Sequence, residues 1–252
     1  MTKKPSTLSV IMKRELKAYF TSPVAYIVTC LFLIINGVLF FSLFFVQNRA
    51  DLRAYFANLP LFLSFFVPAL TMKIFAEERR SGSMETLMTL PVTEWDVVTG
   101  KYLASFFGTL LMIAPTLLYV ITLVIFGSPD AGPVIGGYAG AVFLSAVYTA
   151  IGCFSSSITK NQIIAFFTGL AICLGLTLCD IFVIILPPSL VSFVSYISFR
   201  AHFDSIAKGI LDTRDIIYFL SVTALFFVMT VKVQKKKKNR RKSPKIFQIL
   251  IL

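Results

Sequence analysis

The chain has 252 residues, of which 57% are hydrophobic and only 14% are charged, and its mean hydropathy is +0.83. This composition excludes an ordinary soluble globular domain and is typical of an integral membrane protein. Lys and Arg outnumber Asp and Glu by 24 to 12. Because the excess lies beside apolar segments, we attribute it to membrane topology and lipid headgroups and do not expect a nucleic-acid partner.

The first predicted element is an amphipathic helix over residues 6–20, ended by Thr21-Ser22-Pro23. Apolar side chains recur at helical spacing on one face, and cations occupy the other. We expect this helix to lie on the inner leaflet. Glu15 falls on the apolar face, where it either pairs with a neighbouring base or meets a protein partner. The cations of the opposite face are Lys13, Arg14 and Lys17.

Six apolar segments follow, each long enough or nearly long enough to cross the hydrocarbon core as a helix of about 20 residues. The sequence therefore predicts an all-α polytopic protein, with one membrane domain over residues 1–233 and a basic tail over 234–252. The predicted spans are roughly 24–46, 55–75, 100–126, 134–158, 162–186 and 214–233.

The distribution of cations predicts the orientation of these spans. With the amino terminus in the cytoplasm, nineteen of the 24 Lys and Arg residues fall on the cytoplasmic side, as the positive-inside rule expects. Both termini are then cytoplasmic. The cations left on the outer side are Arg49, Arg53, Arg200, Lys208 and Arg214.

Between the fifth and sixth spans, two apolar pieces at 190–199 and 203–211 are too short to cross a membrane. We interpret them as outer-leaflet or re-entrant helices. Ser189 can cap the first piece and Asp204 lies near the start of the second. Asp212 and Asp215 can cap the last span.

The most informative stretch is the polar insertion from Glu77 to Lys101, between the second and third spans. Gly82 breaks the chain, and Ser83 is a candidate N-cap for a short helix over 84–90, stopped by Pro91. Met84, Leu87 and Met88 form an apolar stripe at helical spacing. Such a helix either packs back on its own bundle or inserts into a groove of a partner. Thr93 can cap the next helix.

These residues resemble the membrane subunit of type 2 ATP-binding-cassette (ABC) transporters, and most nearly the permeases of the gliding-motility and nitrous-oxide-reductase-maturation branch. The resemblance spans nearly the whole chain except the basic tail. It is carried by KRELKAYFTSP (13–23), FAEERRSGSMETLMTLPVTEWDVVTGKYLA (75–104) and FDSIAKGILDTRDIIYFLS (203–221).

The resemblance implies roles for particular residues. The helix from Ser83 to Leu90 corresponds to the coupling helix that docks on an ATP-binding subunit, and the turn from Ser155 to Gln162 to a second cytoplasmic contact. The residues implied in ATPase coupling are Glu77, Glu78, Gly82, Ser83, Met84, Glu85, Leu87 and Met88. Those of the interface helix are Lys13, Arg14, Glu15 and Lys17.

The implied function is that of a permease subunit of an ABC exporter in the bacterial inner membrane. The sequence contains no G-x-x-x-x-G-K-[ST] phosphate loop, so if ATP drives this chain we expect the ATPase to be a separate chain. The resemblance implies two ABC ATPase subunits, and a second copy of this chain or a similar permease. ATP and Mg²⁺ would bind the ATPase, and no cofactor or metal is expected here.

Candidate catalytic residues are scarce. His202 is the only histidine, which excludes a site of several histidines, and a Ser-His pair would need a serine of the same outer segment. We therefore expect no enzymatic activity on this chain. Asp180 is the one acid well inside an apolar segment, where it either contacts a polar substrate or coupling ion or reaches water near the outer end. We favour the second interpretation.

Two other functions remain open at this level. In one, the chain is a membrane anchor or mechanical transmitter that drives a periplasmic partner through residues 187–215 without moving a solute. In the other it is an ion-coupled carrier, which needs intramembrane charges and broken helices, and only Asp180 and Pro115 point that way. The sequence does not indicate a substrate.

Overall fold

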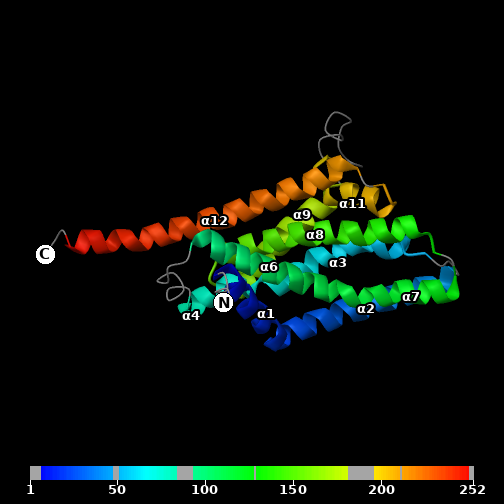
Figure 1. Ribbon diagram of the computed structural model, residues 1–252, viewed down its shortest axis with the longest axis horizontal. Coiled ribbons are helices and arrows are strands. Elements are labelled where there is room, and N and C mark those ends of the chain that lie inside the picture. Colours follow the sequence, from blue (N-terminus) through cyan, green and yellow to red (C-terminus); the bar gives the residue numbers. More distant parts are fainter. Residues whose placement is uncertain are drawn as a thin grey trace, which may run out of the picture.

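A computed structural model describes residues 7–47, 51–83, 93–127, 129–180, 196–210 and 212–249, in which all regular structure is helical. The helices run side by side in an elongated bundle (Figure 1). Their bounds are α1 (Thr7–Thr21), α2 (Pro23–Gln47), α3 (Arg53–Thr71), α4 (Lys73–Ser81), α6 (Glu94–Ile113), the short 3-10 helix η1 (Ala114–Thr116), α7 (Leu117–Phe126), α8 (Ala131–Ile158), α9 (Gln162–Leu178), α11 (Phe199–Ala207) and α12 (Thr213–Ile249).

Within the described residues, five helical stretches are long and apolar enough to cross a membrane. They agree with five of the six predicted spans, and the chain is a multi-pass membrane protein. Helix α9 is apolar but has 17 residues, and the rest of the predicted fifth span lies outside the described residues. A sixth span therefore stays a prediction. The five stretches are Pro23–Ser42, Arg53–Ser81, Glu94–Phe126, Ala131–Ile158 and Thr213–Asn239.

Helix α8 is the centre of the bundle and packs against α3, α6, α9, α11 and α12. Its glycines permit the close approach: a Cβ on Gly152 would collide with Thr71 of α3. The core between α3 and α8 contains Leu63 and Tyr148, both fully buried. The hydroxyl of Tyr148 donates a hydrogen bond to the carbonyl of Pro60, which satisfies a polar group inside the apolar core.

Several local predictions are confirmed at the ends of the helices. Thr93 and Asp96 form a reciprocal capping box at the start of α6. Gly82 ends α4 in the left-handed conformation, with a φ of 77°, which favours glycine because it has no Cβ. The predicted span over 100–126, in contrast, is not one regular helix, because η1 separates α6 from α7 at Pro115. Asp212 accepts a hydrogen bond from the backbone of Arg214 and caps α12.

The predicted bounds around the outer segment are wrong. One helix, α11, runs from Phe199 to Ala207 in place of a piece at 203–211, and residues 181–195 of the preceding segment, Ser189 included, lie outside the described residues. Ser198 caps α11, so the helix begins earlier, and Asp204 is in its interior. Asp215 does not cap α12 with its side chain but binds His202.

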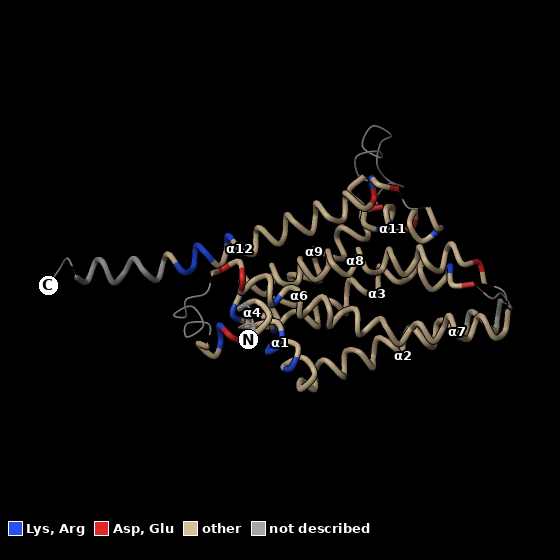
Figure 2. Tube along the Cα trace, in the orientation of Figure 1, with Lys and Arg blue, Asp and Glu red and all other residues tan. Residues whose placement is uncertain are grey.

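Charged residues concentrate at the two ends of the bundle (Figure 2). We call the end that carries α1, α4, the start of α6 and the end of α8 the basic end, because most of the described Lys and Arg lie there. The opposite end carries α11 and the start of α12. Helix α12 continues without a break through the predicted span and into the basic tail, as far as Ile249.

Candidate functional site

Helix α1 packs its apolar face on α6 at the basic end, so this face meets protein as well as any membrane surface. Two glycines of α6 permit the contact. A Cβ on Gly100 would lie 2.9 Å from the side chain of Ile11, and one on Gly108 would lie 2.9 Å from the ring of Tyr19. The Tyr19 hydroxyl also donates to the carbonyl of Gly108, at 3.3 Å. Helix α1 is therefore fixed to the start of the third span.

A cluster of four charged side chains joins α1, α4 and α6. The Nζ atom of Lys101 lies 3.1 Å from Oε1 of Glu15 and 3.0 Å from Oε1 of Glu78. Nη2 of Arg14 lies 2.6 Å from the same Glu15 oxygen and 2.7 Å from the same Glu78 oxygen. We call Arg14, Glu15, Glu78 and Lys101 the ion cluster.

Lys101 is the centre of the ion cluster, because its side chain is fully buried. A buried cation is tolerated only when it is paired and hydrogen-bonded. Lys101 also donates to the carbonyl of Ile74, at 3.0 Å, and its Nζ lies 5.4 Å from the centre of the Phe75 ring. With two cations and two anions, the cluster has no net charge when all four groups are ionised.

The electrostatics of Glu15 follow from this arrangement. Burial opposes its ionisation, but the charge of Lys101 and the hydrogen bonds from Arg14 and Lys101 outweigh burial and hold the pKa of Glu15 below its ordinary value. Glu15 is therefore ionised at neutral pH. Its position on the apolar face of α1, unexplained by the amphipathic pattern, is a consequence of the buried lysine that it meets. The prediction of a local base is correct for Arg14 but missed Lys101.

The structure separates the predicted coupling residues. Glu78 belongs to the ion cluster, whereas its neighbour Glu77 is exposed. Gly82 and Ser83 follow α4 directly, and the Ser83 hydroxyl contacts the Glu78 carbonyl at 3.4 Å. The remaining members, Met84, Glu85, Leu87 and Met88, lie outside the described residues.

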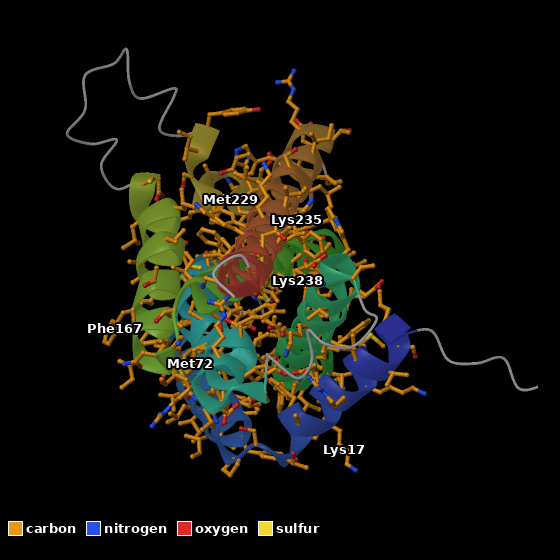
Figure 3. The ribbon with its side chains drawn as sticks, turned by 90° about the vertical axis from the view of Figure 1, so that its left-hand side faces the viewer. Lys17, Met72, Phe167, Met229, Lys235 and Lys238 are labelled. Atoms are coloured by element: carbon orange, nitrogen blue, oxygen red, sulfur yellow. The ribbon has the colours of Figure 1, made fainter. Side chains whose placement is uncertain are left out.

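The four residues predicted for the interface helix also fall into two groups. Arg14 and Glu15 enter the ion cluster, whereas Lys13 and Lys17 are exposed. Viewed from the basic end, Lys17 points away from the bundle (Figure 3). Sequence reasoning counted Lys101 only as a cation at the edge of a span. One signal in the sequence could have indicated its burial. Lys101 lies seven residues after Glu94, where α6 begins, and Val97, Val98 and Ala104, which lie near it on the helix, are apolar.

At the opposite end, charged groups pair within a single corner of the fold. Nε of Arg200 lies 3.9 Å from Oδ2 of Asp180 and 3.9 Å from Oδ2 of Asp204. The Asp180 side chain is 30% exposed, but its Oδ1 is buried without a hydrogen-bond partner, so both interpretations of Asp180 stay predictions. Burial raises the pKa of Asp204, and Arg200 and Lys208 oppose that shift.

His202 lies in the same corner, between two acceptors. Its Nδ1 is 2.6 Å from Oδ1 of Asp215, and its Nε2 is 2.9 Å from the carbonyl oxygen of Tyr196. The imidazole ring stacks on Tyr218, with 4.1 Å between the ring centres. His202 thus contacts a carboxylate, a carbonyl and aromatic rings, an arrangement that holds α11 against α12.

Comparison with protein families decides what this bundle is. The family described as ABC-2 family transporter protein matches residues 46–232, which is about three quarters of the chain. The chain belongs to this family. It is therefore an ABC-2 type permease, the membrane component of an ABC transporter, and membership implies an ABC ATPase subunit as its partner. No curated protein matches the chain.

The family match divides the ion cluster of this ABC-2 permease. Glu78 and Lys101 lie within the matched residues, whereas Arg14 and Glu15 precede them. The basic continuation of α12 beyond residue 232 also lies outside the match. The cluster thus connects the shared membrane domain to the amino-terminal helix, and it does so beside Gly82 and Ser83, where α4 ends.

Proposed function

We propose that this chain is the permease subunit of an ABC exporter in a bacterial inner membrane, nearest to the gliding-motility and nitrous-oxide-reductase-maturation branch. In this proposal a separate ATPase docks on residues 83–90, and ATP-driven movement there rearranges the spans. The observation that carries the proposal is the ion cluster around the buried Lys101, which ties α4, the helix leading into the docking segment, to α1 and α6.

The concentration of cations at the basic end supports a cytoplasmic location for that end. Both termini are then cytoplasmic, and the corner around α11 faces the outside. The same orientation exposes Glu77 and Ser83 to the cytoplasm, where an ATPase can reach them. Six spans follow if α9 continues to about residue 186.

The mechanism that we propose is mechanical. When the ATPase binds ATP and closes, it displaces the docking segment and with it α4. Because Lys101 holds carboxylates from both α1 and α4, a movement of either helix away from α6 would take one of the two carboxylates from the buried cation. The three helices therefore move together. The second and third spans, which begin or end at this cluster, carry the movement to the opposite end.

The proposed assembly contains two permeases, identical or similar, and two ATPases that bind ATP and Mg²⁺. An apolar face of α9 is available for contact between permeases. Phe167 is 61% exposed on this helix and points away from the bundle (Figure 3), and a Cβ on Gly175 would meet no atom within 4 Å. A substrate would pass along the contact between the two permeases.

The adjacent glutamates Glu77 and Glu78 provide the test. Glu77 is exposed beside the docking segment, so Glu77→Gln should weaken ATPase binding. Glu78→Gln removes one charge of the ion cluster, so it should leave ATPase binding intact and weaken transmission by roughly tenfold, within the usual range of coupling energies. Binding is measured between the purified permease in nanodiscs and the ATPase subunit that copurifies with it.

Transmission is measured as the ATP-dependent change in the rate of maleimide labelling of Ile210→Cys at the opposite end, with Cys30 and Cys179 replaced by Ser. Ile210 is 60% exposed, so its label reports on the outer corner. Lys17→Met is the control, because Lys17 is exposed and should affect neither measurement. Failure of any ATPase to copurify with the unaltered chain would refute the proposal. An undiminished labelling change in Glu78→Gln would refute the role of the ion cluster.

A further inference from the structure

Helix α12 does not end where its apolar span ends. It continues through nine Lys and Arg residues between 232 and 245, and the sequence contains no Asp or Glu after Asp215. The continuation lies outside the family match, which stops at residue 232. The shared permease domain therefore does not account for this basic helix.

The start of this continuation is fixed to the helices around the docking segment. Gln234 is almost fully buried and accepts a hydrogen bond from Nη2 of Arg79 in α4, at 3.0 Å. Nζ of Lys238 lies 2.6 Å from Oε1 of Glu94, at the start of α6. The basic helix is thus held by both helices that flank residues 84–92.

A third contact holds the same helix to the end of α8. Nζ of Lys237 donates to the carbonyls of Ser157 and Ile158, at 2.9 and 3.0 Å. These belong to the last turn of α8, whose carbonyls lack partners within the helix and attract a cation. Gln234, Lys237 and Lys238 share one face, because helical neighbours are three and four residues apart.

The other face of the helix is free of these contacts and basic. Lys232, Lys235, Lys236 and Asn239 follow the same helical spacing, and all four are exposed. Beyond Lys238 the helix continues for eleven residues, about 16 Å at 1.5 Å per residue. It leaves along the long axis of the bundle and does not turn across its end (Figure 1).

From this placement we infer that the basic continuation of α12 is a second docking arm, which binds an acidic surface on the ATPase subunit. The inference rests on the proposed function, since it takes the ATPase to dock on residues 83–90. An arm fixed to α4 and α6 and directed away from the membrane lies beside a body docked between them. A lipid-binding helix would lie in the plane of the headgroups. A basic arm without acids is complementary to an acidic surface and should speed and strengthen association at low salt.

The test neutralises the arm while it keeps the contacts that hold it. The variant Arg240→Gln, Arg241→Gln, Lys242→Gln removes three charges that follow Lys238 in the sequence and leaves Gln234, Lys237 and Lys238 unchanged. Its matched control, Arg240→Lys, Arg241→Lys, Lys242→Arg, keeps them. The affinity of the copurified ATPase subunit is measured in nanodiscs of neutral phosphatidylcholine at low and high salt. The neutralised arm should lower the affinity about tenfold at low salt, and the difference should shrink at high salt.

The outcomes separate this inference from the function on which it rests. Equal affinity for the neutralised and the control arm overturns the inference, while the proposed function stands. The inference is also overturned if the neutralised arm binds the ATPase more weakly than the control arm only in nanodiscs that contain anionic phosphatidylglycerol. The arm would then act by binding lipid. Absence of ATPase binding to the unaltered chain would refute the proposed function itself. A truncation after Asn239 provides a second variant, in which the same loss of affinity is expected.

Discussion

The two ends of the bundle use charge differently. At the basic end, one buried lysine holds carboxylates from α1 and α4, although Glu15 and Lys101 are 86 residues apart in the sequence. At the opposite end, His202 and Asp215 are only 13 residues apart and join neighbouring helices. The ion cluster thus joins three helices, one of them far from the other two in the sequence, whereas His202 and Asp215 join two that follow each other. The basic end is therefore suited to transmission.

The largest expected effect that follows from this comparison is that of Lys101→Met. Removing the buried cation leaves two partly buried carboxylates with Arg14 alone, and breaking a buried ion pair in this way lowers the free energy of unfolding by about 3 to 5 kcal/mol. Denaturant unfolding in mixed micelles measures the change. Lys17→Met removes an exposed lysine of α1 and should change stability by less than about 0.5 kcal/mol. Similar values for the two variants would show that the ion cluster does not hold the basic end together.

A smaller effect is expected when α1 is displaced sterically. In Gly108→Ala the new methyl group meets the Tyr19 ring, and overpacking of this kind destabilises by about 1 to 3 kcal/mol. Gly175→Ala is the matched control, because its methyl group meets no atom and alanine favours a helix. The accessibility to maleimide of a cysteine placed at Ile11, which is buried, reports whether α1 has left α6. Equal accessibility in both variants would contradict the close packing of the two helices.

The corner at the opposite end provides the third prediction. His202→Gln should lower local stability by about 1 to 3 kcal/mol, because Asp215 loses its partner while it stays buried. Amide hydrogen exchange of α11 and the start of α12 measures this loss. Arg200→Gln should have less effect, since its ion pairs are longer and partly exposed. If His202→Gln weakened ATPase binding as strongly as Glu77→Gln does, the assignment of ATPase docking to the basic end alone would be wrong.

The smallest expected effect is on the pH dependence of stability. The pKa of Glu15 is lowered in the folded protein, so its contribution to stability is present above its ordinary value of 4.5 and is lost as the pH falls through the lowered value. The difference in melting temperature between the unaltered chain and Glu15→Gln should therefore be constant near neutral pH and shrink in acid. A difference that grew in acid would contradict the assigned direction.

Much of the fold follows from the sequence because apolar length and local chemistry are strong signals. The capping box at Thr93 and the break at Gly82 both depend on residues close together in the chain. The predicted start of α11 is wrong because the helix begins at the cap Ser198, from which Phe199, Phe203 and Ile206 share a buried face.

The ion cluster could be predicted only in part. The family pattern pointed to Glu78, and the amphipathic pattern marked Glu15 as out of place, but neither identified the partner that the two share. Lys101 looked like one more cation at a membrane boundary. Its role depends on how α1 folds back on α6, a tertiary contact made possible by Gly100 and Gly108. The continuation of α12 was likewise visible as a charge run, but its attachment to α4, α6 and α8 required the structure.

The central claim is that the ion cluster makes α1 and α4 move as one body when the ATPase acts. Spin labels at Lys17→Cys on α1, Arg80→Cys on α4 and Ile163→Cys on α9 test it directly, because all three positions are exposed at the basic end. In the complex with its ATPase, ATP should change the distances from α9 to both α1 and α4 and leave the distance between α1 and α4 unchanged. In Glu78→Gln, ATP should change the distance between α1 and α4 as well. A change in the distance between α1 and α4 in the unaltered complex would contradict the account.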